Sequence, residues 1–426
     1  MKLSATSVFV PGSYPEHTYV ERSDAKLTHR LRDALTESGK FISVTGPSKS
    51  GKTVLVENIV GKENLIVITG AGITQASDVW NRILDWMEIP STVSKSAKSA
   101  SATTVALGGA ASGSIPLIAK AEVNGKVEQK NERATDNVEV RGRRGLKDVE
   151  REIAKSGYVV LLDDFHYIPT HIQAEVMKDI KEAARLGIQI CIASVMNRAD
   201  DAIRANQEMQ GRFTAIDLNY WSVDELMQIA DKGFDALNAV LPVEYSKYLA
   251  NEAAGSPQLM QTLCLEACRT LSHRDRTVCK TTLAATLEQK KEVFGDAAAT
   301  MDFSSLVDVL DCGPKERGKE RKVYKFANGR TGDVYRSILN SIASDPPMLS
   351  FSYDELLSRV GKICDGEHPS GGSIHGSCEH MVKLAQQRFP NERQIDWNKE
   401  REVLDITEPY LLFYLRWSQR LSQPNV

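Results

Sequence analysis

Residues 46–53 read Gly-Pro-Ser-Lys-Ser-Gly-Lys-Thr and match the pattern G-x-x-x-x-G-K-[ST] at every fixed position. An apolar run at 41–44 precedes this motif, and a segment typical of a helix, 54–59, follows it. This strand–loop–helix context is what a phosphate-binding loop requires. Gly46 and Gly51 would let backbone N–H groups turn toward a phosphate, and the N-terminus of the helix adds positive charge. The sequence therefore predicts a phosphate loop in an α/β domain.

The side chains of this loop predict which groups of a nucleotide it would bind. Lys52 would neutralise oxygens of the β- and γ-phosphates, and the Thr53 hydroxyl would bind Mg²⁺. Residues 398–400 begin a guanine signature, Asn-Lys-x-Asp, without completing it, which favours ATP over GTP. ATP and Mg²⁺ are therefore the expected cofactors. The residues expected to contact the nucleotide phosphates are Gly46, Pro47, Ser48, Lys49, Ser50, Gly51, Lys52 and Thr53.

A second motif follows an apolar run at 158–162. Such a run is typical of a central parallel strand that is buried on both faces. It ends in Asp163 and Asp164, and carboxylates at this end of a strand lie beside the phosphate loop. We expect Asp163 to hold Mg²⁺ through water and Asp164 to be the base that polarises the attacking water. Two aspartates after a strand usually form a turn, but the phosphate loop upstream favours the functional interpretation.

The bulk composition restricts the class of protein. The chain has 426 residues, enough for two or three domains, and its 42% hydrophobic and 26% charged residues are typical of a soluble globular protein. A net charge of −3 argues against a uniformly basic nucleic-acid coat. No run approaches the roughly 18 apolar residues of a membrane span, and no signal peptide is evident. Seven scattered cysteines suit a reducing compartment, so we expect a cytoplasmic protein without membrane contact.

The pattern along the chain predicts three parts. Residues 1–221 form the expected α/β core, a parallel sheet with helices on both faces, which includes an insertion at about 91–137. Of the first 25 residues of that insertion, 19 are Ser, Ala, Thr or Gly, a composition typical of a flexible segment. Residues 222–298 are expected to form an all-helical lid domain, which Ser222 begins as a helix N-cap. Residues 299–426 make up the last part.

The last part combines helices with a two-stranded hairpin, which is the arrangement of a winged helix. The helices are expected at 334–342, 353–360, 373–387 and 409–421, and the strands at 393–397 and 402–406. A basic run precedes them, because residues 315–330 hold seven basic and two acidic residues. This run is either a solvated linker or a contact for DNA phosphates.

This order of motifs resembles that of AAA+-type ATPases, in the branch that joins origin-recognition ATPases, STAND ATPases and TniB/TnsC-like transposition ATPases. The resemblance covers nearly the whole chain as an order of elements. It implies a P-loop NTPase core, ATP hydrolysis and assembly into a homo-oligomer. Many AAA+ enzymes carry Asp-Glu where this chain has Asp163 and Asp164. Aspartate reaches one methylene less far, so a slow, switch-like ATPase is at least as plausible as a motor.

The resemblance also assigns roles near the base of the nucleotide. The segment 19–22, Tyr-Val-Glu-Arg, is similar to the box that packs against adenine in these families. Val20 and Arg22 are therefore expected at the nucleotide, although Arg22 could instead pair with an acidic neighbour. Gly-Ser-Pro at 255–257 resembles the Gly-x-Pro of the helical lid, which places Pro257 at the same site.

Further residues would act on the γ-phosphate if the resemblance holds. Ser194 or Asn197 matches the first sensor, and Arg198 resembles an arginine that STAND members place beside it. Arg212 lies where an arginine finger would reach the nucleotide of a neighbouring subunit. It could equally be an ordinary surface arginine.

Two functions fit these features. The first is an ATP-driven switch of the STAND kind, which controls self-assembly or a partner effector protein, as in bacterial defence or signalling. The second is an ATPase of transposition or origin recognition that binds double-stranded DNA through helix 373–387. That helix offers only Lys383 as a cation, with Arg388 just beyond it, beside Glu379. A helix that reads a DNA groove normally carries more Arg, Lys, Asn or Gln, which favours the switch.

Overall fold

The computed structural model describes residues 3–22, 25–95, 139–195, 209–314, 320–390 and 392–422. Its largest sheet has five parallel strands in the order β2-β5-β6-β1-β7. These strands are β1 (Phe41–Thr45), β2 (Leu65–Thr69), β5 (Val159–Asp163), β6 (Gln189–Ser194) and β7 (Phe213–Asp217). Parallel neighbours need crossover connections, and helices supply most of them here.

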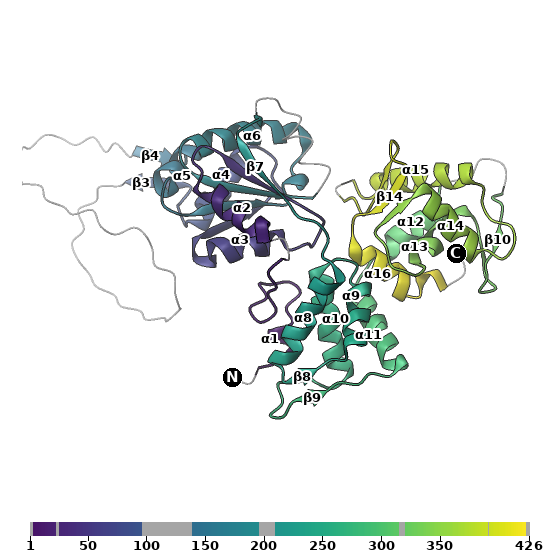
Figure 1. Ribbon diagram of the computed structural model, residues 1–426. Helices are drawn as coiled ribbons and strands as arrows, with labels where there is room; N and C mark the ends of the chain where they lie inside the picture. The colour runs from purple at the N-terminus through teal and green to yellow at the C-terminus, as the bar shows by residue number, and fades with distance from the viewer. Residues whose placement is uncertain are drawn as a thin grey trace, which may run out of the picture.

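Helices cover both faces of this sheet (Figure 1). Alternate residues of β5 enter two separate hydrophobic clusters, Val160 and Leu162 in one and Val159 and Leu161 in the other. The first cluster is covered by α4 (Ser77–Trp86), α5 (Leu146–Ile153) and α6 (Thr170–Arg185), the second by α2 (Ala25–Thr36) and α3 (Lys52–Val60). A strand that is buried on both faces reads as a continuous apolar run, which is why the sequence revealed it. The predicted P-loop NTPase fold class is confirmed.

A two-stranded antiparallel ribbon extends from this domain. It pairs β3 (Thr92–Lys95) with β4 (Glu139–Gly142). The ribbon brackets the predicted insertion at 91–137, nearly all of which lies outside the described residues.

The next part of the chain is helical. Its elements are α8 (Val223–Ala236), α9 (Val243–Glu252), α10 (Pro257–Thr270) and α11 (Leu287–Ala299), with short strands β8 (Ala239–Val240) and β9 (Thr281–Thr282). Ser222 caps α8 as predicted: its hydroxyl accepts a hydrogen bond from Glu225 N at 3.2 Å, and the Glu225 carboxylate accepts one from Ser222 N at 2.8 Å. The sequence pattern did not single out α11.

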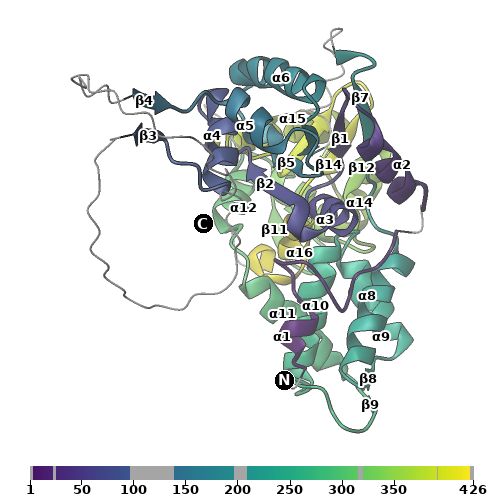
Figure 2. The same cartoon turned by 90° about the vertical axis from the view of Figure 1, so that its left-hand side faces the viewer.

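The N-terminal segment belongs to the same hydrophobic cluster as these helices. It forms α1 (Ala5–Val8), which lies against α10 (Figure 2). Ala5, Val8 and Phe9 are buried among residues of α8 to α11. The segment therefore links the helical part to the beginning of the α/β core. The proposed limit between these two domains, after residue 221, remains a prediction.

The C-terminal part contains the four predicted helices and the hairpin where the sequence pattern places them. Its elements are α12 (Ser304–Cys312), β10 (Tyr324–Lys325), β11 (Thr331–Gly332), α13 (Val334–Ala343), β12 (Ser350–Ser352), α14 (Tyr353–Ile363), α15 (Gly371–Arg388), β13 (Ile395–Asn398), β14 (Val403–Ile406) and α16 (Pro409–Trp417). Strand β12, which the sequence analysis did not identify, joins the hairpin in a sheet of order β12-β14-β13. In the described part of the chain no helix has the length and apolar character needed to cross a membrane.

Helix α16 belongs to two hydrophobic clusters at once. Phe413 is buried with the helices α8 to α11, whereas Leu411 and Leu415 are buried with α12 to α15. A buried ion pair fixes the junction: Arg416 donates to both carboxylate oxygens of Glu252 at 2.7 and 2.9 Å. Their side chains are 7% and 2% exposed. Helix α16 therefore ties the helical part to the C-terminal part (Figure 1).

Removal of this buried pair should destabilise the junction. Arg416→Met keeps much of the side-chain volume but leaves the Glu252 carboxylate buried without its cation, although the Trp417 indole still donates to it, so the free energy of unfolding should fall by about 3 kcal/mol. Urea unfolding followed by tryptophan fluorescence measures the change. Arg185→Met is the control. Arg185 pairs with Glu182 on the surface of α6, so its loss should leave the urea midpoint of unfolding unchanged. Equal midpoints for the two variants would contradict the prediction.

Candidate functional site

The predicted phosphate loop connects β1 to α3 in the conformation that such a loop needs. Gly51 has φ +90° and is the N-cap residue of α3, and Lys49 has φ +58°, so the backbone turns sharply within the motif. A Cβ on Gly46 would lie 2.8 Å from the Leu218 side chain, so this position requires glycine. The loop therefore sits at the C-terminal end of the sheet, at the N-terminus of a helix that favours anions.

The Lys52 side chain is buried within this loop. Its ammonium donates to the carbonyl oxygens of Gly46 at 3.2 Å and Pro47 at 2.8 Å, and the residue is only 7% exposed. Burial lowers the pKa of Lys52, and the carboxylates of Asp163 and Asp164 oppose that effect. The cation is thus held at the place where nucleotide phosphates would bind.

Thr53 and Asp163 meet at the ends of α3 and β5. The Thr53 hydroxyl donates to Asp163 Oδ2 at 2.6 Å. Hydroxyl and carboxylate oxygens are hard ligands of the kind Mg²⁺ prefers, so this pair fits the predicted magnesium site. Among the described residues no three acidic, His or Cys side chains converge in a metal-sized group, so the remaining ligands would be phosphate and water oxygens.

Asp164 follows directly in a left-handed conformation, with φ +54°. Its backbone N–H donates to Asp163 Oδ1 at 2.9 Å. Burial, followed by the charge of Asp163, raises the pKa of Asp164, whereas Lys52 lowers it. A carboxylate with a raised pKa beside a magnesium site is suited to accept a proton from water.

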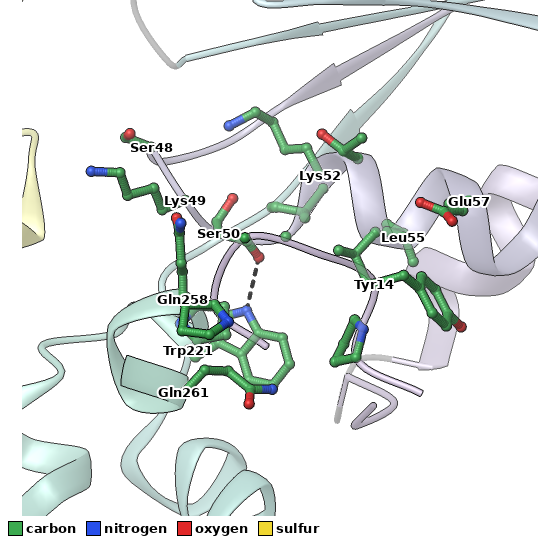
Figure 3. A pocket seen from close by; sticks show the side chains of 18 of the residues that line it. Tyr14, Ser48, Lys49, Ser50, Lys52, Leu55, Glu57, Trp221, Gln258 and Gln261 are labelled. Carbon is green, nitrogen blue, oxygen red and sulfur yellow. Dashed lines mark hydrogen bonds between the residues drawn. The ribbon is translucent and has the colours of Figure 1, made fainter. Parts of the chain in front are cut away.

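A cavity of about 590 Å³ extends from this loop toward the helical part (Figure 3). Val20 and Pro257, both predicted at the nucleotide, line it. Arg22 lines it as well, but its guanidinium lies 3.3 Å from Glu225 and 4.8 Å from the centre of the Trp221 ring. The structure therefore gives Arg22 the acidic partner that the sequence left open as an alternative.

Three further residues that line the cavity, Tyr14, Trp221 and Glu408, were not among the predicted site residues. The rings of Tyr14 and Tyr19 stack with centroids 6.1 Å apart, and the Tyr14 hydroxyl donates to Asn58 Oδ1 at 2.7 Å. The Trp221 indole donates to Ser50 O at 2.9 Å, which links the phosphate loop to the start of α8 (Figure 3). The third is Glu408, just before α16. Aromatic residues between predicted elements were the available signal for the first two, and no local signal marked Glu408.

The residues assigned to the γ-phosphate lie in different places. Ser194 is buried at the end of β6, where its carbonyl oxygen accepts from Gly46 N at 3.3 Å. Asn197 and Arg198 lie outside the described residues. Arg212 is exposed and precedes β7, which runs parallel to β1. It therefore lies at the N-terminal end of the strands, whereas the phosphate loop of its own chain lies at their C-terminal end, roughly 16 Å away for a strand of this length.

Comparisons with known proteins add only distant likenesses. No family model and no curated protein matches the sequence. A Walker-type ATPase of Pyrococcus abyssi is 12% identical with a TM-score of 0.49, covering 93% of this chain and 96% of that one. The ORC2 protein of Aeropyrum pernix is 13% identical with a TM-score of 0.48, covering 97% of each chain. The RuvB Holliday junction branch migration motor of Thermotoga maritima is 12% identical with a TM-score of 0.40, covering 91% of this chain and 93% of that one. The chain's own parallel sheet and loop geometry make its core a P-loop NTPase fold.

Proposed function

We propose that this chain binds ATP with Mg²⁺ and hydrolyses it slowly, as a switch of the AAA+/STAND kind. Nucleotide binding would change how the helical and C-terminal parts pack on the α/β core, and so control self-assembly or a partner effector. One observation supports this proposal above all. The cavity at the phosphate loop is lined by three parts of the chain: the core, the helical part and the C-terminal part.

The chemistry proposed for the core follows from its side chains. Lys52 would bind the β- and γ-phosphates, and Thr53 and Asp163 would hold Mg²⁺, which neutralises phosphate charge when bound. Asp164 would orient a water molecule and accept its proton, which its raised pKa favours. Its short side chain supports slow turnover rather than the cycling of a motor.

The contacts of the basic residues in the C-terminal part support the switch over the DNA-binding alternative. On α15 Lys383 lies 3.6 Å from Glu379, and Lys399 lies 3.1 Å from the same carboxylate. Arg321, in the basic run, pairs with Asp333 at 2.7 Å. A cation that already pairs with a carboxylate contributes less free energy to the binding of a DNA phosphate. We therefore propose that the predicted winged helix packs against the other domains and regulates them.

Asp164→Asn tests the proposed ATPase switch. An amide cannot accept the proton from water, so ATP turnover should fall by about 10²- to 10⁴-fold while ATP binding remains. In the wild type, turnover should also fall as the pH drops through the raised pKa of Asp164, because the protonated carboxyl is no longer a base. Phosphate release and ATP binding are measured in parallel. Static light scattering should show that ATP-dependent assembly persists longer in the variant.

The matched control is Asp33→Asn, which changes an exposed aspartate on α2 of the same domain. It should turn over ATP as the wild type does. Normal hydrolysis by the Asp164→Asn protein would remove Asp164 from the base role. ATP binding without any change in mass or domain packing would contradict the switch.

A further inference from the structure

A carboxylate from the C-terminal part reaches the phosphate loop. Glu408 is the N-cap residue of α16, and its Oε1 accepts a hydrogen bond from Lys49 Nζ at 2.9 Å. Its Oε2 accepts a hydrogen bond from Ser48 Oγ at 3.2 Å. Ser48 and Lys49 are neighbours in the loop, and their side chains point to the same side of it (Figure 3). One residue of the C-terminal part thus binds two residues of the nucleotide site.

Further contacts hold this arrangement in place. The Lys49 ammonium also lies 4.0 Å from the centre of the Tyr410 ring, a cation–π contact. The Tyr410 hydroxyl is 3.3 Å from Thr262 Oγ1 on α10. Glu408 Oε1 accepts from Tyr410 N at 3.2 Å, which caps α16. Lys49 is therefore fixed by two residues of α16, and α16 is itself anchored to the helical part.

The Glu408 carboxylate also lines the cavity in which the terminal phosphates would bind. Glu408 lines the same cavity as Lys52, and its charge, with those of Asp163 and Asp164, opposes the lowering of the Lys52 pKa by burial. In a phosphate loop this lysine binds the β- and γ-phosphates. A third phosphate would therefore bring more negative charge toward Glu408, and like charges at short range repel.

We propose that Glu408 is a specificity-determining residue that makes the site distinguish a nucleoside triphosphate from a diphosphate. A diphosphate leaves the Glu408–Lys49 pair intact and the C-terminal part closed on the loop. A γ-phosphate repels Glu408 and takes Lys49 as its own partner, which releases α16. This inference rests on the proposed nucleotide binding, and it identifies the Glu408–Lys49 pair as the contact that responds to the γ-phosphate.

The buried Arg416–Glu252 pair would transmit the movement of α16 to the helical part. Glu408 begins α16 and Arg416 lies near its end, where it is paired with α9 of the helical part. A shift of α16 would therefore move the helical and C-terminal parts together relative to the phosphate loop. Buried, well-packed junctions transmit such shifts because they resist continuous deformation.

The test is a comparison of two affinities in the full chain. Dissociation constants are measured for ADP and for a non-hydrolysable ATP analogue by calorimetry. Glu408→Gln removes the charge but keeps an oxygen that can cap α16. The analogue should bind more tightly relative to ADP by about tenfold in this variant, since the repulsion of the γ-phosphate is gone. Glu400→Gln, which removes an exposed carboxylate from the β13–β14 turn, should leave the ratio unchanged.

The outcomes separate this inference from the proposed function. An affinity ratio unchanged by Glu408→Gln, with both nucleotides bound, would overturn the role of Glu408 and leave ATP binding standing. Absence of nucleotide binding by the wild type would overturn the proposed function instead. If Glu408→Gln does not fold, Glu408→Asn replaces it, because asparagine caps a helix well and carries no charge. The ratio should then shift in the same direction, and a constant ratio would contradict the proposal.

Discussion

Lys52→Ala is expected to abolish detectable ATP binding. The Lys52 ammonium is buried inside the phosphate loop, where it is held by the carbonyl oxygens of Gly46 and Pro47. Asp163 and Asp164 lie close enough to influence its pKa. Without the lysine, the β- and γ-phosphates would lose their protein cation and would face these carboxylates with only Mg²⁺ between them. The loss should therefore be larger than that of an ordinary surface charge.

Calorimetric titration with ATP and Mg²⁺ measures this loss. Lys62→Ala is the matched control, because Lys62 is an exposed lysine just after α3 and its removal lowers the net charge equally. Circular dichroism checks that both variants are folded. ATP affinity in Lys52→Ala equal to that of the control would mean that the nucleotide, if any, binds elsewhere.

Arg212→Ala is expected to remove the dependence of ATPase activity on protein concentration. Arg212 is exposed at the edge of the sheet opposite the phosphate loop, so it cannot reach the nucleotide of its own chain. If it supplies a finger to a neighbouring subunit, it stabilises charge on the γ-phosphate there, and such a contact is worth roughly 10³-fold or more in rate. Specific activity in the wild type should then rise as subunits associate.

The measurement is phosphate release per subunit over a wide range of protein concentration. Arg212→Ala should stay at the low rate of isolated subunits while its ATP affinity remains close to that of the wild type. Arg185→Ala, which removes another exposed arginine of the same domain, should behave as the wild type. A wild-type specific activity that is constant with concentration, matched by Arg212→Ala, would exclude both the finger and the oligomeric switch.

The phosphate loop and the core strands could be predicted from the sequence because their determinants are local. Residues 46–53 are contiguous, so their spacing alone defines the loop. The strand β5 is apolar along its length because both of its faces are covered, and parallel strands bring their C-terminal ends to one edge. That geometry places Asp163 beside Thr53 although 110 residues separate them. The Ser222 cap is likewise a short-range pattern.

Fewer of the remaining helices, and fewer of the residues near the base of the nucleotide, could be predicted from local patterns. The apolar residues of helix α11 make it only weakly amphipathic, and tertiary packing buries Val293 and Phe294. Val20 and Pro257 were placed at the cavity only through a family resemblance, and the structure does line the cavity with them. Arg22 had two possible partners, and its position beside Glu225 was decided by how α8 packs on the N-terminal segment.

The contacts between domains were decided by the tertiary structure alone. Glu408 and Lys49 are 359 residues apart, and neither lies in a pattern that points to the other. The same is true of Trp221 and the Ser50 carbonyl, which are 171 residues apart. Periodicity records which face of an element is buried, but it does not record which domain covers that face. A single side-chain pair across an interface leaves no repeat in the sequence, so only the folded chain determines that the C-terminal part reaches the phosphate loop.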